Sequence, residues 1–286
     1  MRLHVTLPSL VLVACALALA PAALAADEGD DLGNPEKAAK RFEKAVEKAP
    51  TDSESHYNLG LAYSKLERWA DAEKSLRRAV ELNGQSAQFQ AALGVALAKN
   101  NKPNEAVTAY EAALALDSTR LDVQANLGQA YLEAGKVDQA IEMYKGALKN
   151  KPADPSAFYN NLGSAYLKKG DMDSAIRWFE KNIEAAPNSA VTYYNLGQIY
   201  RKVAADSSKP EMWTKAAETL VKAAEMDPKN LKGLFFAGEA LIVSGKNQAG
   251  LAYIDRYIAA DPGGKKTSPD MFADAQSYKE ELAAKK

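Results

Sequence analysis

The sequence has few of the side chains from which catalytic and metal sites are built. Its 286 residues include one cysteine, Cys15, and two histidines, His4 and His56. Zinc sites and thiol or imidazole catalysis need several such groups close together. Carboxylates are plentiful, but they are scattered along polar helix faces and no glycine-rich phosphate loop accompanies them. We therefore expect a protein that is not an enzyme, with no catalytic residue, cofactor or metal.

An excess of one charge and a long hydrophobic run are also missing. The chain has 36 Lys and Arg against 37 Asp and Glu, so it has no general attraction to nucleic acid or to anionic lipid. Its longest apolar run, residues 10–20, is shorter than the ~20 residues that span a bilayer. The composition is 47% hydrophobic and 26% charged, typical of a soluble folded protein. We expect no nucleic-acid partner and no membrane span.

The first 25 residues have the pattern of a secretory signal. Arg2 precedes the apolar run, Pro21 ends it, and Ala23-Leu24-Ala25 supplies the small residues that signal peptidase recognises. The pattern predicts a signal peptide over residues 1–25, cleavage after Ala25 and a periplasmic location. Residues 26–33 would then form a short acidic, flexible tail at the new N-terminus.

A second interpretation of the same segment remains open. Leu12-Val13-Ala14-Cys15 resembles the lipobox of bacterial lipoproteins. Cleavage before Cys15 would leave a lipidated cysteine and anchor the protein to the outer membrane. Against this, residues 16–26 stay apolar, unlike the usual polar tether, and Cys15 also suits the hydrophobic core of a plain signal.

The remainder of the chain repeats one motif. A glycine recurs at intervals of 34, 34, 35, 34 and 41 residues, and two columns of mostly small residues follow it, at the same distances in every repeat except the fifth. The glycine column is Gly60, Gly94, Gly128, Gly163, Gly197 and Gly238, and the first small-residue column is Ala72, Ala106, Ala140, Ala175, Ala216 and Gly250.

The spacing within one repeat predicts two amphipathic helices. His56, Leu59, Gly60 and Tyr63 follow the i, i+3, i+4, i+7 spacing of one helix face, and the segment from Ala72 to Ala79 does the same. A glycine inside a helix costs about 1 kcal/mol relative to alanine, so a recurring one needs a packing reason. We expect it to let the two helices of a pair approach closely.

These columns over residues 53–264 resemble the tetratricopeptide repeat. The resemblance implies an all-α fold: a right-handed superhelical solenoid with six full repeats, an N-terminal half repeat and a C-terminal capping helix. In repeat five, the additional residues near 204–212 predict a loop, either a binding element or surface decoration. The expected segments are 34–52 for the half repeat, 53–86, 87–120, 121–154, 156–189, 190–230 and 231–264 for the repeats, and 265–286 for the capping helix.

The resemblance places one face of each first helix in a concave peptide-binding groove. A residue two positions before the glycine points away from it, and four repeats have asparagine there: Asn58, Asn126, Asn161 and Asn195. Some members of the family bind the backbone of an extended peptide with such a ladder, because a primary amide both donates and accepts. The alternative is that these asparagines hydrogen-bond neighbouring helices of the same chain.

Other groove candidates flank the asparagines. Lys65, Lys99, Lys168 and Lys202 would favour an acidic segment or a terminal carboxylate, although surface lysines are common without such a role. Tyr57 and Tyr194 precede the asparagine column by one residue and suit apolar side chains of a ligand. The sequence thus favours a non-catalytic scaffold, exported from the cytoplasm, that binds a protein or peptide partner and supports an envelope complex. The alternative is a lipoprotein, anchored through Cys15, that assists assembly of a type IV pilus or a secretion pore.

Overall fold

A computed structural model describes residues 34–207 and 209–284. This described part contains fourteen α-helices and no strand, which confirms the predicted all-α fold. The described residues belong to two compact units, 34–153 and 154–284.

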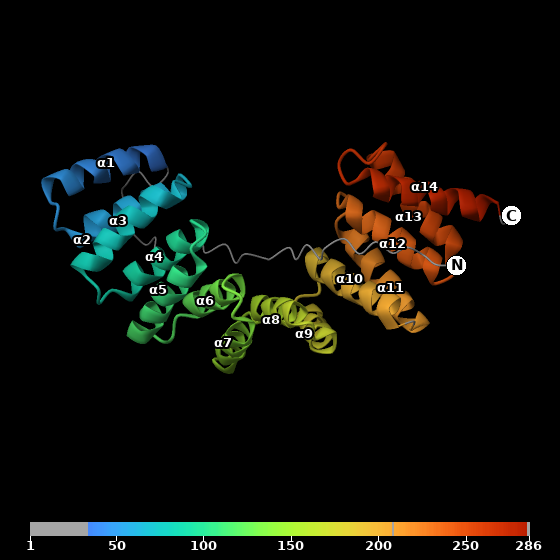
Figure 1. Ribbon diagram of the computed structural model, residues 1–286, viewed down its shortest axis with the longest axis horizontal. Coiled ribbons are helices and arrows are strands. Elements are labelled where there is room, and N and C mark those ends of the chain that lie inside the picture. Colours follow the sequence, from blue (N-terminus) through green and yellow to red (C-terminus); the bar gives the residue numbers. More distant parts are fainter. Residues whose placement is uncertain (1–33, 208, 285–286) are drawn as a thin grey trace. The chain divides into compact units, whose positions relative to one another are not determined.

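The N-terminal unit is a single helix followed by three helix pairs (Figure 1). In each pair the second helix packs on the first, and it also packs on the first helix of the next pair in the unit. The helices are α1 Pro35–Lys48, α2 Ser53–Lys65, α3 Trp69–Leu82, α4 Ala87–Lys99, α5 Pro103–Leu116, α6 Leu121–Glu133 and α7 Val137–Lys149.

The C-terminal unit has the same organisation with a single helix at its other end. Three pairs are followed by α14, whose Ala275 is fully buried and whose Met271 and Tyr278 pack against the core of the unit. The predicted capping helix is therefore present. The helices are α8 Ser156–Lys169, α9 Met172–Ala185, α10 Ala190–Ser207, α11 Pro210–Met226, α12 Leu231–Val243, α13 Asn247–Ala260 and α14 Pro269–Ala283.

Five of the six pairs turn from first to second helix through one left-handed residue. The backbone N–H of the residue after it donates to a carbonyl five positions back, as from Lys136 to Tyr131 at 2.7 Å and from Lys246 to Leu241 at 2.8 Å. Such a bond pairs a carbonyl that the helix end leaves unsatisfied. The left-handed residues are Glu67, Asn101, Gly135, Gly170 and Gly245.

The fifth pair is built differently, and the loop expected there is wrong. Its helices are 18 and 17 residues long, against 13 or 14 in the other pairs. Ala204 and Ala205 continue α10, and Pro210 stands at the start of α11, where a missing N–H is tolerated. Most of the additional residues thus lengthen two helices instead of forming a loop.

The glycine column holds the two helices of each pair together. A Cβ built at Gly94 would lie 2.6 Å from the ring of Tyr110, and one at Gly163 would lie 2.6 Å from the ring of Phe179. The same relation joins Gly60 to Leu76, Gly128 to Tyr144, Gly197 to Leu220 and Gly238 to Ile254. The close approach inferred from the sequence is confirmed in all six pairs.

A tyrosine–glutamate hydrogen bond also recurs within the units. Tyr63 donates to Glu43 at 2.7 Å, Tyr131 to Glu111 at 2.6 Å and Tyr200 to Glu180 at 2.7 Å, always from a first helix to the second helix before it. Burial, followed by the nearby carboxylate, raises the pKa of Tyr131 to about 12. These bonds join α1 to the first pair and, within each unit, one pair to the next.

The Gly128→Ala substitution tests the helix contact. The added methyl group would overlap the ring of Tyr144, so we expect the free energy of unfolding to fall by about 1–3 kcal/mol in urea denaturation. Gly146→Ala is the matched control, because a Cβ at Gly146 in α7 meets no neighbouring atom within 4 Å. That change should raise the unfolding free energy by up to about 1 kcal/mol. Equal effects of the two substitutions would contradict the close contact.

Candidate peptide-binding surface

The first helices of the N-terminal unit carry a row of side chains that reach the surface. Helix α2 contacts α4, and α4 contacts α6, so their corresponding residues form one row. Each member is exposed or half-buried, on the helix side opposite the packed glycine. We call this row the first-helix stripe; it comprises Asn58, Leu61, Lys65, Ala92, Val95, Lys99, Asn126, Gln129 and Glu133.

The stripe combines hydrogen-bonding, apolar and charged groups. Asn58 and Asn126 are half-buried at its two ends, and the small Ala92 stands between them on α4. Lys65 and Lys99 are exposed at the C-terminal ends of α2 and α4. At the same position of α6, Glu133 accepts a hydrogen bond from Gln129 Nε2 at 2.9 Å. The positive side chains therefore belong to the first two pairs only.

Tyr57 lies beneath this stripe and is only 3% exposed. Its ring stacks on Phe89 of α4 with the centroids 4.7 Å apart, and its hydroxyl accepts from Gln88 Nε2 at 2.8 Å. Burial is the main cause that raises the pKa of Tyr57. Its ring is thus enclosed between α2 and α4 and is not offered to a ligand in this state.

The equivalent surface of the C-terminal unit is more enclosed. Asn161 on α8 is half-buried, whereas Asn195 on α10 is only 2% exposed. Tyr194 is half-buried, and burial raises its pKa. Lys168 is exposed, and Lys202 Nζ lies 3.4 Å from Asp206. Of the four asparagines, two thus belong to each unit, and Asn195 alone is buried.

Several enclosed polar atoms of α8 and α10 have no hydrogen-bond partner among the described residues. They include Nδ2 of Asn160 and of Asn195 and Nε2 of Gln198. An unsatisfied buried donor costs about 1–3 kcal/mol. These amides could therefore gain energy from an acceptor, such as a peptide carbonyl, if their surroundings moved to admit one.

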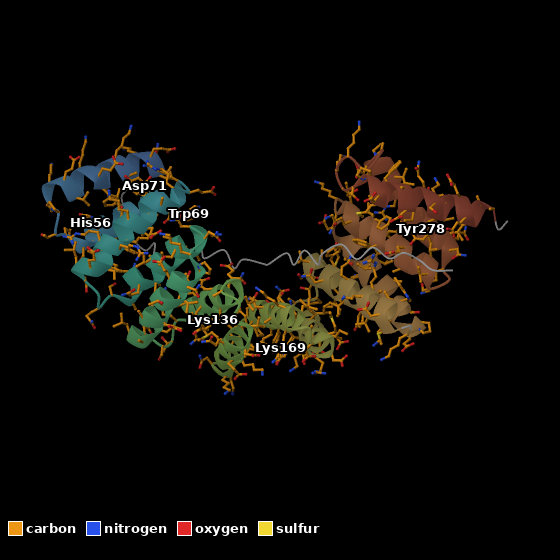
Figure 2. All side chains as sticks on the ribbon, in the orientation of Figure 1. His56, Trp69, Asp71, Lys136, Lys169 and Tyr278 are labelled. Atoms are coloured by element: carbon orange, nitrogen blue, oxygen red, sulfur yellow. The ribbon has the colours of Figure 1, made fainter. Side chains whose placement is uncertain are left out.

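A buried ion pair explains why this surface is enclosed. The side chains of Arg201 on α10 and Glu239 on α12 form an ion pair and are 4% and 6% exposed. The Arg201 guanidinium carbon lies 4.3 Å from the ring centroid of Phe236. From α14, Tyr278 (Figure 2) donates to Glu239 at 3.4 Å. Burial, followed by the charge of Glu239, raises the pKa of Tyr278.

This ion pair was not predicted from the sequence, although the sequence contained a signal for it. Arg201 occupies a column that otherwise holds Ser64, Ala98, Leu132, Leu167 and Ile242. Glu239 occupies a column that is otherwise uncharged, with Leu61, Val95, Gln129, Ser164 and Gln198. The two opposite charges stand at positions where the other repeats have no charge. This difference was the available indication of an ion pair.

The described residues give no support to metal chemistry or to a membrane span. No group of three potential ligands could hold a metal ion there, and none of the described helices is long and apolar enough to cross a bilayer. His56 (Figure 2) has its Nε2 3.0 Å from the carbonyl oxygen of Pro50. Cys15, the predicted lipidation site, and the predicted cleavage after Ala25 lie outside the described residues.

Comparison with known families identifies the repeat. Models of the tetratricopeptide repeat match residues 31–95, 87–120, 125–190 and 213–265. No curated protein matches the sequence. The family matches extend over both units and over most of the chain.

Solved structures agree with this result. PilF of Pseudomonas aeruginosa is 21% identical, with a TM-score of 0.60, over 86% of this chain and 100% of its own. MamA is 30% identical, with a TM-score of 0.52, over 54% of this chain and 90% of its own. YrrB, a protein with an unusual peptide-binding site, is 23% identical, with a TM-score of 0.54, over 69% of this chain and 97% of its own. These likenesses confirm the fold of stacked helix pairs.

The Glu239→Ala substitution tests the buried ion pair. It leaves the Arg201 charge buried without its partner, so we expect the free energy of unfolding to fall by about 3–5 kcal/mol in chemical denaturation. Asp206→Ala is the control, since it removes the more exposed Lys202–Asp206 pair and should cost no more than about 1 kcal/mol. A small effect of Glu239→Ala, similar to the control, would show that Arg201 finds water or another partner.

Proposed function

The chain belongs to the tetratricopeptide-repeat family, and from this premise we propose that it is a non-catalytic scaffold that binds an extended segment of a partner protein along its first-helix stripe. The family fold itself indicates protein partners. The more specific assignment, to the stripe of the N-terminal unit, rests on the residues that this unit leaves accessible.

One observation carries the proposal: Asn58 in the first pair and Asn126 in the third pair are both half-buried on the surface of the N-terminal unit, whereas Asn195 at the same position of the C-terminal unit is buried. Each amide can donate to a peptide carbonyl and accept from a peptide N–H, so it recognises backbone without regard to sequence. Ala92, between them, leaves room for the chain of a ligand to pass. The solved structure of YrrB, which has a peptide-binding site on the same kind of fold, supports the assignment by analogy.

The strength of these bonds shows what else the stripe must contribute. Four hydrogen bonds from two amides give about 2–6 kcal/mol, which is less than the ~8 kcal/mol of micromolar binding. Leu61 and Val95 lie beside the amides and are half-buried, so apolar side chains of the ligand can cover them. Lys65 and Lys99 favour acidic residues in the part of the ligand that crosses α2 and α4. The proposed ligand is thus an extended segment with apolar and acidic side chains.

We expect the double substitution Asn58→Ala, Asn126→Ala to weaken binding of such a segment. The measurement is titration calorimetry with a peptide selected from an array of acidic and apolar sequences. Loss of two hydrogen bonds, one from each amide, should weaken binding by about 1–3 kcal/mol, which is about 5- to 150-fold in affinity.

A matched control distinguishes the effect of losing the stripe amides from the effect of losing any two asparagines. Asn104→Ala, Asn188→Ala removes two exposed amides outside the stripe and should leave the affinity unchanged. Wild-type affinity in the Asn58/Asn126 variant, with peptide binding intact, would contradict the assignment of the stripe.

The location of the scaffold is a separate part of the proposal. The pattern of residues 1–25 supports export to the periplasm, where the scaffold would support an envelope complex. The lipobox that ends at Cys15 supports the alternative, an outer-membrane lipoprotein that assists pilus or secretion-pore assembly.

The intact mass of the mature protein, purified from its native host, distinguishes these locations. An unmodified chain that begins at Ala26 is the expected result. A mass that corresponds to a chain beginning at Cys15 with attached lipid would establish the alternative.

A further inference from the structure

The third helix pair has a pocket on a surface that the proposed function does not use. The pocket has a volume of about 440 Å³ and lies between α6 and α7. We call it the Gly146 pocket; it is lined by Gln124, Tyr131, Gln139, Glu142, Met143, Gly146 and Ala147. None of these residues belongs to the first-helix stripe, so the pocket is a second candidate surface of the N-terminal unit.

Gly146 itself helps to explain why the space is open. The glycines of the packed column each face a large side chain, but a Cβ at Gly146 would meet no neighbouring atom within 4 Å. A glycine inside a helix costs about 1 kcal/mol, and here no helix contact within the unit compensates for it. The corresponding residues of the other repeats are larger, and four of the five are cations: Arg78, Ala112, Lys181, Lys222 and Arg256.

Gln124 gives the pocket an unsatisfied polar group. Its side chain is 9% exposed, and its Nε2 donates to the carbonyl of Ser118 at 2.9 Å. Its Oε1 is buried and has no hydrogen-bond partner among the described residues. Reversing the amide would place two oxygens against each other at Ser118, so the orientation is fixed. Gln124 therefore lines the pocket and keeps one buried acceptor that a donor could reach if its side chain moved.

Other pairs of the chain show which donor fits this position. In the fourth pair, Lys181 Nζ lies 4.5 Å from the ring centroid of Trp178, the residue equivalent to Met143. In the sixth pair, the Arg256 guanidinium carbon lies 5.1 Å from the ring centroid of Tyr253, at the same position. In two of the four pairs that have a cation at this position, the basic side chain thus lies over the residue equivalent to Met143. The third pair has the apolar Met143 there and lacks the cation.

The charge at the rim agrees with a basic occupant. Glu142 is exposed, and among the described residues its ion pair is with Lys145 Nζ at 3.3 Å, a surface contact of small energy. Met143, Gly146 and Ala147 provide apolar surface for the methylene groups of a long side chain. An arginine could lie along them and present several N–H donors to Gln124 Oε1 and to the Glu142 carboxylate.

We propose that the Gly146 pocket binds an arginine side chain of a partner protein, in the place that Lys181 and Arg256 take in the fourth and sixth pairs. The pocket lies apart from the proposed peptide stripe, so a partner could contact the N-terminal unit at two surfaces. A lysine would satisfy fewer acceptors, because its ammonium group lacks the planar set of donors of arginine.

Methionine-methyl NMR tests the proposal with N-acetyl-arginine amide as the probe. The chain has six methionines, so the Met143 methyl signal can be assigned by substitution. We expect a saturable shift of this signal with the arginine probe and a smaller one with N-acetyl-norleucine amide, which has a similar apolar stem and no charge. Glu142→Gln should weaken binding of the arginine probe several-fold and leave the norleucine response unchanged.

Gly146→Arg fills the pocket from within and should abolish the shift. Ala112→Arg is the matched control, because it adds the same side chain at the equivalent position of the preceding pair and should preserve the shift.

The space at Gly146 indicates that the Gly146→Arg variant folds, and a thermal scan verifies this. Absence of a saturable Met143 shift in the wild type, or an undiminished shift in folded Gly146→Arg, would overturn the proposal. Asn58→Ala, Asn126→Ala should not change the shift, so failure of the peptide stripe is distinguishable from failure of the pocket.

Discussion

Every helix pair depends on one contact, in which a large side chain of the second helix lies against a glycine of the first. The ring of Tyr110 occupies the space that a Cβ at Gly94 would need, and Phe179 does the same at Gly163. The glycine costs helix propensity, but it brings two helix axes close and fixes which faces are buried. The opposite face of each first helix is then left for other interactions.

What happens on that opposite face differs between the two units. In the N-terminal unit it keeps Asn58, Asn126 and their apolar neighbours accessible. In the C-terminal unit the chain encloses much of it, because Arg201 and Glu239 pair there and Tyr278 of α14 lies beside them. Helix α12 is buried from Gly233 to Leu241, as expected for a helix surrounded by others. The same repeat motif thus leaves its first-helix surface accessible in the N-terminal unit and largely buried in the C-terminal unit.

The sequence predicts the architecture well, because packing within a pair is local and periodic. The glycine and alanine columns determine both helices of a pair, and their partners lie within the same repeat. Burial of the first-helix surface is harder to predict, since it depends on the next repeat. Tyr57 is covered through Gln88, 31 residues later, and Arg201 through Glu239, 38 residues later. The Gly146 pocket was not predicted, because from the sequence an additional glycine in a helix indicates only a lower helix propensity. The space beside it depends on the packing of α6 and α7, which the structure shows.

The most direct measurement of the central claim is NMR of the side-chain amides with the peptide selected for binding. We expect the amide signals of Asn58 and Asn126 to shift with saturation and that of Asn104, on the exposed surface of α5, to stay in place. Saturable binding that leaves both stripe amides unmoved would show that the peptide binds elsewhere and would contradict the account.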